Sequence, residues 1–139
     1  MTTKNIELAK NSWALVAQMD MVVVGGLFYG KLFELSPEVK PLFSRAPIPE
    51  QSRKLLVMLT YVISKLDNLG EILEEVKQLA KRHNAYGVKG EHYAAVGAAL
   101  LWTLEQGLAE NWNKELKTAW TEVYATLAGA MIEAQHVDA

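Results

Sequence analysis

The chain has 139 residues, of which 50% are hydrophobic and 22% charged, and its formal net charge is −2. This size suits one globular domain spanning residues 1–139, and the lack of a basic excess argues against a nucleic-acid groove or a polybasic membrane contact. Cysteine is absent, which excludes disulfides, thiolate zinc sites, iron–sulfur clusters and cofactors attached through cysteine.

The N-terminal residues contain no apolar signal core. The longest apolar stretch, Val22 to Phe28, is too short to span a bilayer and contains two glycines. We therefore expect a cytoplasmic protein without a membrane segment.

Hydrophobic residues recur with a period near 3.6 and show no sustained alternation, which predicts an all-α fold. Ser36-Pro37 opens a short helix well, because serine caps a helix and proline suits its first position. In chain order we expect helices over Lys4 to Met19, Asp20 to Leu35, Ser36-Pro37 to Phe43, from near Pro49 through Leu66, after Asp67 to Gly70 as far as Gly87, Glu91 to Ala109, and Asn113 to Ala134.

The same periodicity predicts which side chains face the core. They are Ile6, Trp13 and Val16; Val22, Gly25, Gly26, Tyr29 and Phe33; Gln51, Leu55, Leu59, Val62 and Leu66; Ile72, Val76, Leu79 and His83; Tyr93, Val96, Leu100 and Leu104; and Leu116, Trp120, Val123, Leu127 and Met131.

Three polar residues on these apolar faces have two interpretations each. A buried imidazole at His83 needs a partner, so it is either a hydrogen-bonded core histidine or an axial ligand of a haem. Tyr29 is either a core tyrosine with a paired hydroxyl or a ligand contact, and Gln51 is either a solvated glutamine or the start of a pocket. Judged singly, each residue favours the structural interpretation.

Taken together, these residues resemble the globin family. Tyr29, Pro37 six residues before Phe43, Gln51, Leu55 and His83 follow the family's order and approximate spacing over nearly the whole chain. The likeness is strongest to single-domain bacterial globins and the haem domain of flavohaemoglobins, through the segments Pro37 to Phe43, Glu50 to Leu55 and Glu91 to Gly97, with Trp13, Trp120 and Tyr124 in support. It implies the globin fold, a three-over-three helical sandwich around a non-covalent haem b.

The resemblance also implies a role for each matching residue. His83 matches the proximal iron ligand, and Tyr29 and Gln51 match distal positions that stabilise a bound ligand. Gly25 and Ser52 match two positions at which the family has small residues, where two helices cross closely. Phe43, Leu55, Val88, Tyr93 and Val96 match haem-contacting positions. The basic residues Arg45, Arg53 and Lys54 flank the distal side, where they either pair with haem propionates or form a solvated cationic rim. His92, next to Tyr93 at a helix start, is expected to be solvated.

The implied function is reversible binding of O2 and of other diatomic gases, NO and CO, at a five-coordinate ferrous iron. The alternative is NO dioxygenation with an external reductase, since the chain has no Gly-x-Gly-x-x-Gly element. A glutamate that the family places against the proximal histidine falls on Gln135 here, with Glu133 nearby but on a different face. The short connection from Phe43 to Gln51 favours a neuroglobin-like or stand-alone bacterial globin. His83 and Phe43 argue against a haemless interaction protein.

Overall fold

A computed structural model of the chain describes residues 2–43, 47–72, 74–78, 81 and 90–137, and this part is helical without strands. Residues 74–78 form a helical turn. The other elements are α1 (Thr3–Val16), α2 (Met21–Leu35), η1 (Pro37–Phe43), α3 (Ile48–Ser64), η2 (Leu66–Ile72), α5 (Gly90–Leu108), η3 (Ala109–Asn111) and α6 (Lys114–Val137). The predicted all-α class is confirmed.

Side-chain caps set the beginnings of the first two helices. The Thr2 hydroxyl accepts a hydrogen bond from the backbone N–H of Asn5 at 3.1 Å. The Asp20 carboxylate accepts one from the backbone N–H of Val22 at 2.8 Å. The sequence had suggested that the helix includes Asp20, whereas Asp20 precedes α2 as its cap. The chain bends by 115° between α1 and α2.

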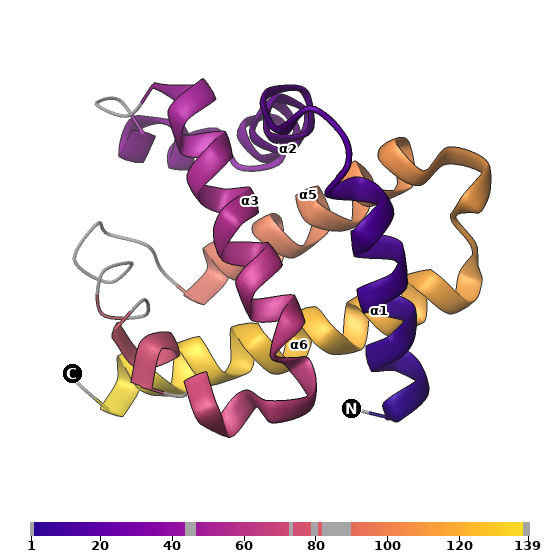
Figure 1. Ribbon diagram of the computed structural model, residues 1–139. Helices are drawn as coiled ribbons and strands as arrows, with labels where there is room; N and C mark the ends of the chain where they lie inside the picture. Colours follow the sequence, from indigo (N-terminus) through magenta and orange to yellow (C-terminus); the bar gives the residue numbers. More distant parts are fainter. Residues whose placement is uncertain (1, 44–46, 73, 79–80, 82–89, 138–139) are drawn as a thin grey trace.

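The helices pack in crossing pairs around one core (Figure 1). α2 lies against α3 and α5, while α6 lies against α1 and α5. Where α1 meets α6, the rings of Trp13 and Trp120 lie 6.0 Å apart, and the Trp120 indole N–H donates to the Ser12 hydroxyl at 2.9 Å. A buried indole N–H without a hydrogen-bond partner would offset part of the stability gained from burying the ring, and Ser12 provides that partner.

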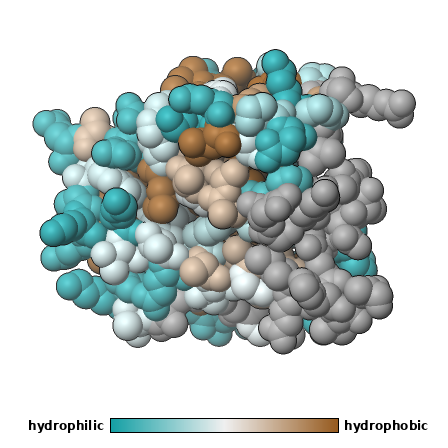
Figure 2. Space-filling model, turned by 180° about the vertical axis from the view of Figure 1, so that it is seen from behind, coloured by the Kyte–Doolittle hydropathy of each residue, from teal (hydrophilic) through white to brown (hydrophobic). Residues whose placement is uncertain are grey.

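The face that α2 turns to the core differs from the prediction. Val24, Phe28 and Leu32 are buried together with Gly25 and Tyr29, whereas Gly26 is exposed and Val22 is half-buried. The helix is apolar nearly all round, so periodicity alone could not select its inner face. Its outer face keeps Val23 60% and Leu27 37% exposed, and apolar surface gathers at the top of Figure 2, the end where α2 lies in Figure 1.

Among the described residues, no single helix has both the length and the apolar character needed to cross a membrane, and only α1 and α2 taken together, as a bent pair, satisfy both criteria.

Candidate functional site

Tyr29 from α2 and Gln51 from α3 are brought together by the crossing of their helices. Tyr29 is only 4% exposed. Burial raises the pKa of its phenol to about 12, while a side-chain hydrogen bond with Gln51 acts in the opposite direction and lowers it. The two residues that the sequence had marked as ambiguous therefore form a pair in the interior, and Gln51 is half-buried rather than solvated.

Aromatic rings surround the Tyr29 phenol. The centroid of Tyr29 lies 5.0 Å from that of Phe28 and 5.2 Å from that of Phe43, both in edge-to-face orientation. Phe33 completes the cluster, 5.7 Å from Phe43 and 6.0 Å from Tyr29. This cluster joins α2 to η1, so it holds Phe43 beside the Tyr29–Gln51 pair.

The crossing of α2 and α3 is close because of Gly25 and Ser52. An ideal Cβ on Gly25 would lie 2.1 Å from the Cβ of Ser52, and Ser52 is 0% exposed. The Ser52 hydroxyl donates to the Ile48 carbonyl at 2.7 Å, so its polar atom is satisfied within α3. The expected close pair is confirmed, and Gln51 directly precedes Ser52 along α3.

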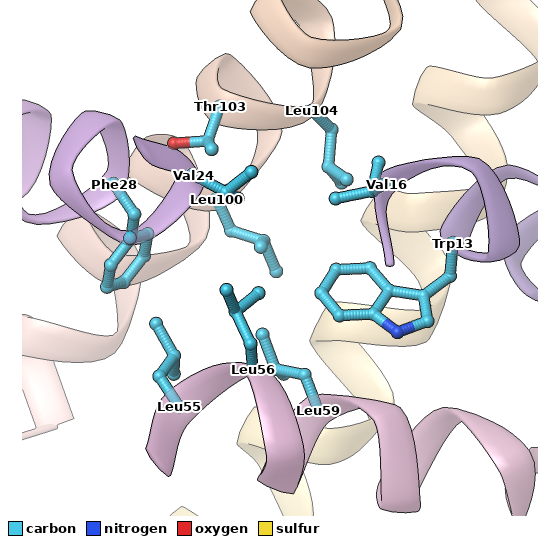
Figure 3. A pocket seen from close by; sticks show the side chains of 11 residues that line it. Trp13, Val16, Val24, Phe28, Leu55, Leu56, Leu59, Leu100, Thr103 and Leu104 are labelled. Atoms are coloured by element: carbon cyan, nitrogen blue, oxygen red, sulfur yellow. The ribbon is translucent and has the colours of Figure 1, made fainter. Parts of the chain in front are cut away.

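Leu55, one helical turn after Gln51, borders a small apolar cavity between α1, α2, α3 and α5 (Figure 3). Its volume is about 10 Å³, and its lining is apolar apart from Thr103. The Thr103 hydroxyl donates to the Ala99 carbonyl at 2.8 Å, so the cavity offers no free hydroxyl donor. Trp13, Phe28, Leu56 and Leu100 are among the other lining side chains.

The first turns of α5 carry two further predicted residues, Tyr93 and Val96. Tyr93 is buried and Val96 is half-buried against the core. His92, expected to be solvated, is only 6% exposed, which corrects that expectation. On η1, the hydrogen bond that the Ser36 hydroxyl donates to the Glu38 carboxylate lowers the pKa of Glu38.

Two of the basic residues predicted near the haem edge, Arg53 and Lys54, lie at the surface. Arg53 and Lys54 are exposed on α3, and Lys54 Nζ lies 3.7 Å from Glu50 one turn earlier. An exposed pair of this kind contributes at most about 1 kcal/mol. The structure thus leaves both side chains at the surface without bringing them to Tyr29 or Phe43.

Other predicted site residues lie outside the described residues: His83, Val88 and Arg45. The side chains of Glu133 and Gln135 are likewise outside them. Within the part that is described, histidine, cysteine, aspartate and glutamate side chains form no group of three or more suited to a metal ion.

Sequence reasoning missed two features of this region. Phe28 was not predicted to be buried, although its spacing from Val24 and Leu32 is the helical signal that would have found it. The hydrogen bond from the Tyr124 hydroxyl to Tyr93 was also missed. Its acceptor is the backbone carbonyl of Tyr93, and the pattern of side chains along the sequence does not predict such a contact.

Comparison with known proteins agrees with this arrangement. The chain is 29% identical to neuroglobin-1 of Oncorhynchus mykiss, over 94% of this chain and 90% of that protein. It is 28% identical to a flavohemoprotein of Bacillus subtilis, over 93% of this chain but only 33% of that protein. A bacterial globin of Campylobacter jejuni is similar in structure, with a TM-score of 0.84 and 28% identity, covering 98% of this chain and 97% of the other. The globin family model matches residues 26–131, and the chain therefore belongs to the globin family of haem-type, gas-binding proteins.

Proposed function

We propose that this globin carries a non-covalent haem b held through His83 and that it binds O2 reversibly, with NO and CO as further ligands. The described residues fit such a group, because Phe43, Leu55 and Val96 are apolar side chains on three different elements that pack against the core and stay only partly buried. A flat apolar cofactor would cover this remaining surface. Its iron would supply the reversible attachment of a diatomic gas.

The observation that carries this proposal is the pairing of the buried Tyr29 with the half-buried Gln51. The phenol of Tyr29, with its pKa raised to about 12, is protonated at physiological pH and can donate a hydrogen bond. The amide of Gln51 offers a second N–H donor. A ligand that becomes partly negative on binding, as O2 does, is stabilised by both donors, and a hydrogen bond to a charged group is worth roughly 1.5–3 kcal/mol. CO gains little charge and therefore gains little from them.

The cavity beside Leu55 is small and apolar. A volume of about 10 Å³ is at the lower limit for one water-sized molecule. Its lining is apolar and lacks the several polar partners that would hold a water. A larger or charged substrate would not fit there.

Gln51 also bears on the coordination of the iron. A histidine at this position would itself be a good iron ligand, whereas an amide is a poor one. We therefore infer that the ferrous protein without added gas has five ligands around iron, with the sixth position open.

The second candidate is an enzyme that converts NO and O2 to nitrate. Its support is the likeness to the Bacillus flavohemoprotein, of which this chain matches about one third. The same Tyr29–Gln51 pair would serve it. This reaction consumes one electron per turnover, so it needs a separate reductase as partner.

One experiment separates the two candidates. NO is added to the purified oxygenated protein, nitrate is measured, and the rate at which a cell extract returns the protein to the ferrous state is followed. Reversible gas binding as the main function predicts slow re-reduction and about one nitrate per haem. Sustained nitrate formation over many turnovers would instead favour the dioxygenase.

A further inference from the structure

Tyr124 on α6 contacts α5 at two points one helical turn apart. Its hydroxyl donates a hydrogen bond to the backbone carbonyl of Tyr93 at 2.5 Å. Its ring lies directly against Gly97, where an added Cβ would be 2.6 Å from Cε2 and 2.9 Å from Cδ2 of Tyr124. One side chain thus joins α6 to both ends of the same turn of α5.

Two-point contact restrains a helix more than a single contact does. Residues four positions apart are neighbours on one face of a helix, so Tyr93 and Gly97 present one continuous surface to the Tyr124 ring. The hydrogen bond fixes the position of this turn along the helix axis, and the ring in the gap at Gly97 fixes its rotation. The directions of the Tyr93 and Val96 side chains follow from those two restraints.

The Tyr124 hydroxyl is well suited to hold this position. Burial raises the pKa of Tyr124 above its ordinary value, so the hydroxyl stays neutral and able to donate. Loss of its acceptor would leave a buried hydroxyl without a hydrogen bond, which disfavours any shift of α5 along α6. The pair therefore has one favoured register.

We propose that Tyr124 is a positioning residue for the haem pocket, which orients Tyr93 and Val96 by holding the first turns of α5 against α6. This inference rests on the proposed function, which assigns those two side chains to haem contact. Tyr124 itself is not required to touch the cofactor.

The test compares Tyr124→Phe with Ser12→Ala in the full-length holoprotein. Tyr124→Phe keeps the ring against Gly97 and removes only the hydroxyl. Ser12→Ala also removes a buried hydroxyl that bonds α1 to α6, but Ser12 has no such contact with α5. Three quantities are measured for each variant: the rate of haem dissociation, the iron–histidine stretching band, and hydrogen exchange at the amides of residues 94–97.

We expect Tyr124→Phe to lose haem about tenfold faster, the change that corresponds to one hydrogen bond of about 1.4 kcal/mol. Its iron–histidine band should shift and exchange at residues 94–97 should accelerate by a similar factor. Ser12→Ala should lower global stability without any of these local changes. Gly97→Ala, which keeps the hydroxyl but displaces the ring, should reproduce the effects of Tyr124→Phe.

Two results would overturn the proposal. One is wild-type behaviour of Tyr124→Phe in all three measurements. The other is equal acceleration of haem loss in Tyr124→Phe and Ser12→Ala, which would show that haem loss follows global stability. Wild-type protein that takes up no haem would contradict the proposed function instead, and exchange at residues 94–97 would still decide whether Tyr124 holds this turn.

Discussion

Gly25 and Ser52 approach so closely that no other residue type can replace the glycine without moving a helix. An ideal Cβ on Gly25 would lie 2.1 Å from Ser52 Cβ and 2.9 Å from Ser52 Cα. Tyr29 follows Gly25 by one helical turn, and Gln51 precedes Ser52 directly. The close crossing is therefore the structural condition for the Tyr29–Gln51 hydrogen bond.

Gly25→Ala should separate α2 from α3 and destabilise the protein. Overpacking of a tight core contact costs about 1–3 kcal/mol, and here the backbone of Ser52 is part of the obstacle. Gly26→Ala is the matched control, because a Cβ at Gly26 meets nothing within 4 Å. It should stabilise α2 by about 0.5–1 kcal/mol, the usual gain of alanine over glycine in a helix. Urea unfolding measures the change in the free energy of unfolding for both variants. An unchanged free energy of unfolding in Gly25→Ala would contradict the close crossing of α2 and α3.

Tyr29→Phe should weaken O2 binding far more than CO binding. Loss of a hydrogen bond to a partly negative ligand removes roughly 1.5–3 kcal/mol, or about one to two orders of magnitude in the O2 dissociation rate. Stopped-flow measurement of both gases tests this. Tyr61→Phe, which removes the hydroxyl of a 40% exposed tyrosine on α3, should change neither rate. Equal effects of Tyr29→Phe on both gases would rule out the polar distal pocket.

Gln51→His should convert the ferrous protein from five-coordinate to six-coordinate. Imidazole binds iron well and an amide does so poorly. In the reduced protein without added gas, we expect a low-spin absorption spectrum for the variant and a high-spin spectrum for the wild type. Gas association should also slow in the variant, because a bound imidazole has to leave first. If the wild type is already low-spin, the assignment of an open sixth position is wrong.

The raised pKa of Tyr29 predicts a specific loss of stability in alkali. Its folded-state pKa is about 12, against an ordinary tyrosine pKa of 10.0, so the folded protein holds this proton more tightly than the unfolded chain. The contribution is fully present below pH 10 and is lost as the pH rises to 12, amounting to about 2–3 kcal/mol by linkage. Unfolding free energies of the haem-free protein from pH 9 to 12 should therefore fall more steeply in the wild type than in Tyr29→Phe. Parallel curves would show that Tyr29 ionises as freely in the folded state as in the unfolded chain.

Most of the fold followed from periodicity, and the exceptions have physical causes. In α5 and α6 the 3.6-residue pattern selected the inner face correctly, and Leu100, Leu104, Leu116 and Val123 are buried as predicted. In α2 the pattern is weak because both faces are apolar, and Gly26 was assigned to the wrong side.

The site was less accessible to sequence reasoning than the fold. Tyr29 and Gln51 each favoured a structural role when taken alone, and only the order of several residues indicated a shared pocket. Their hydrogen bond depends on how closely α2 and α3 approach each other. Gly25 permits that close approach, but a glycine in the sequence does not by itself predict it. The contact between Tyr124 and the Tyr93 carbonyl has no side-chain signature at the acceptor, so only the three-dimensional structure could show it.

The absorption spectrum of the purified, haem-supplemented protein tests the central claim most directly. It is recorded oxidised, reduced and CO-bound, in the wild type and in His83→Ala. We predict a strong Soret band, a five-coordinate ferrous spectrum and a CO complex in the wild type, with loss or large weakening of haem binding in His83→Ala. No Soret band in the wild type after haem supplementation, or an unchanged spectrum in His83→Ala, would contradict the account.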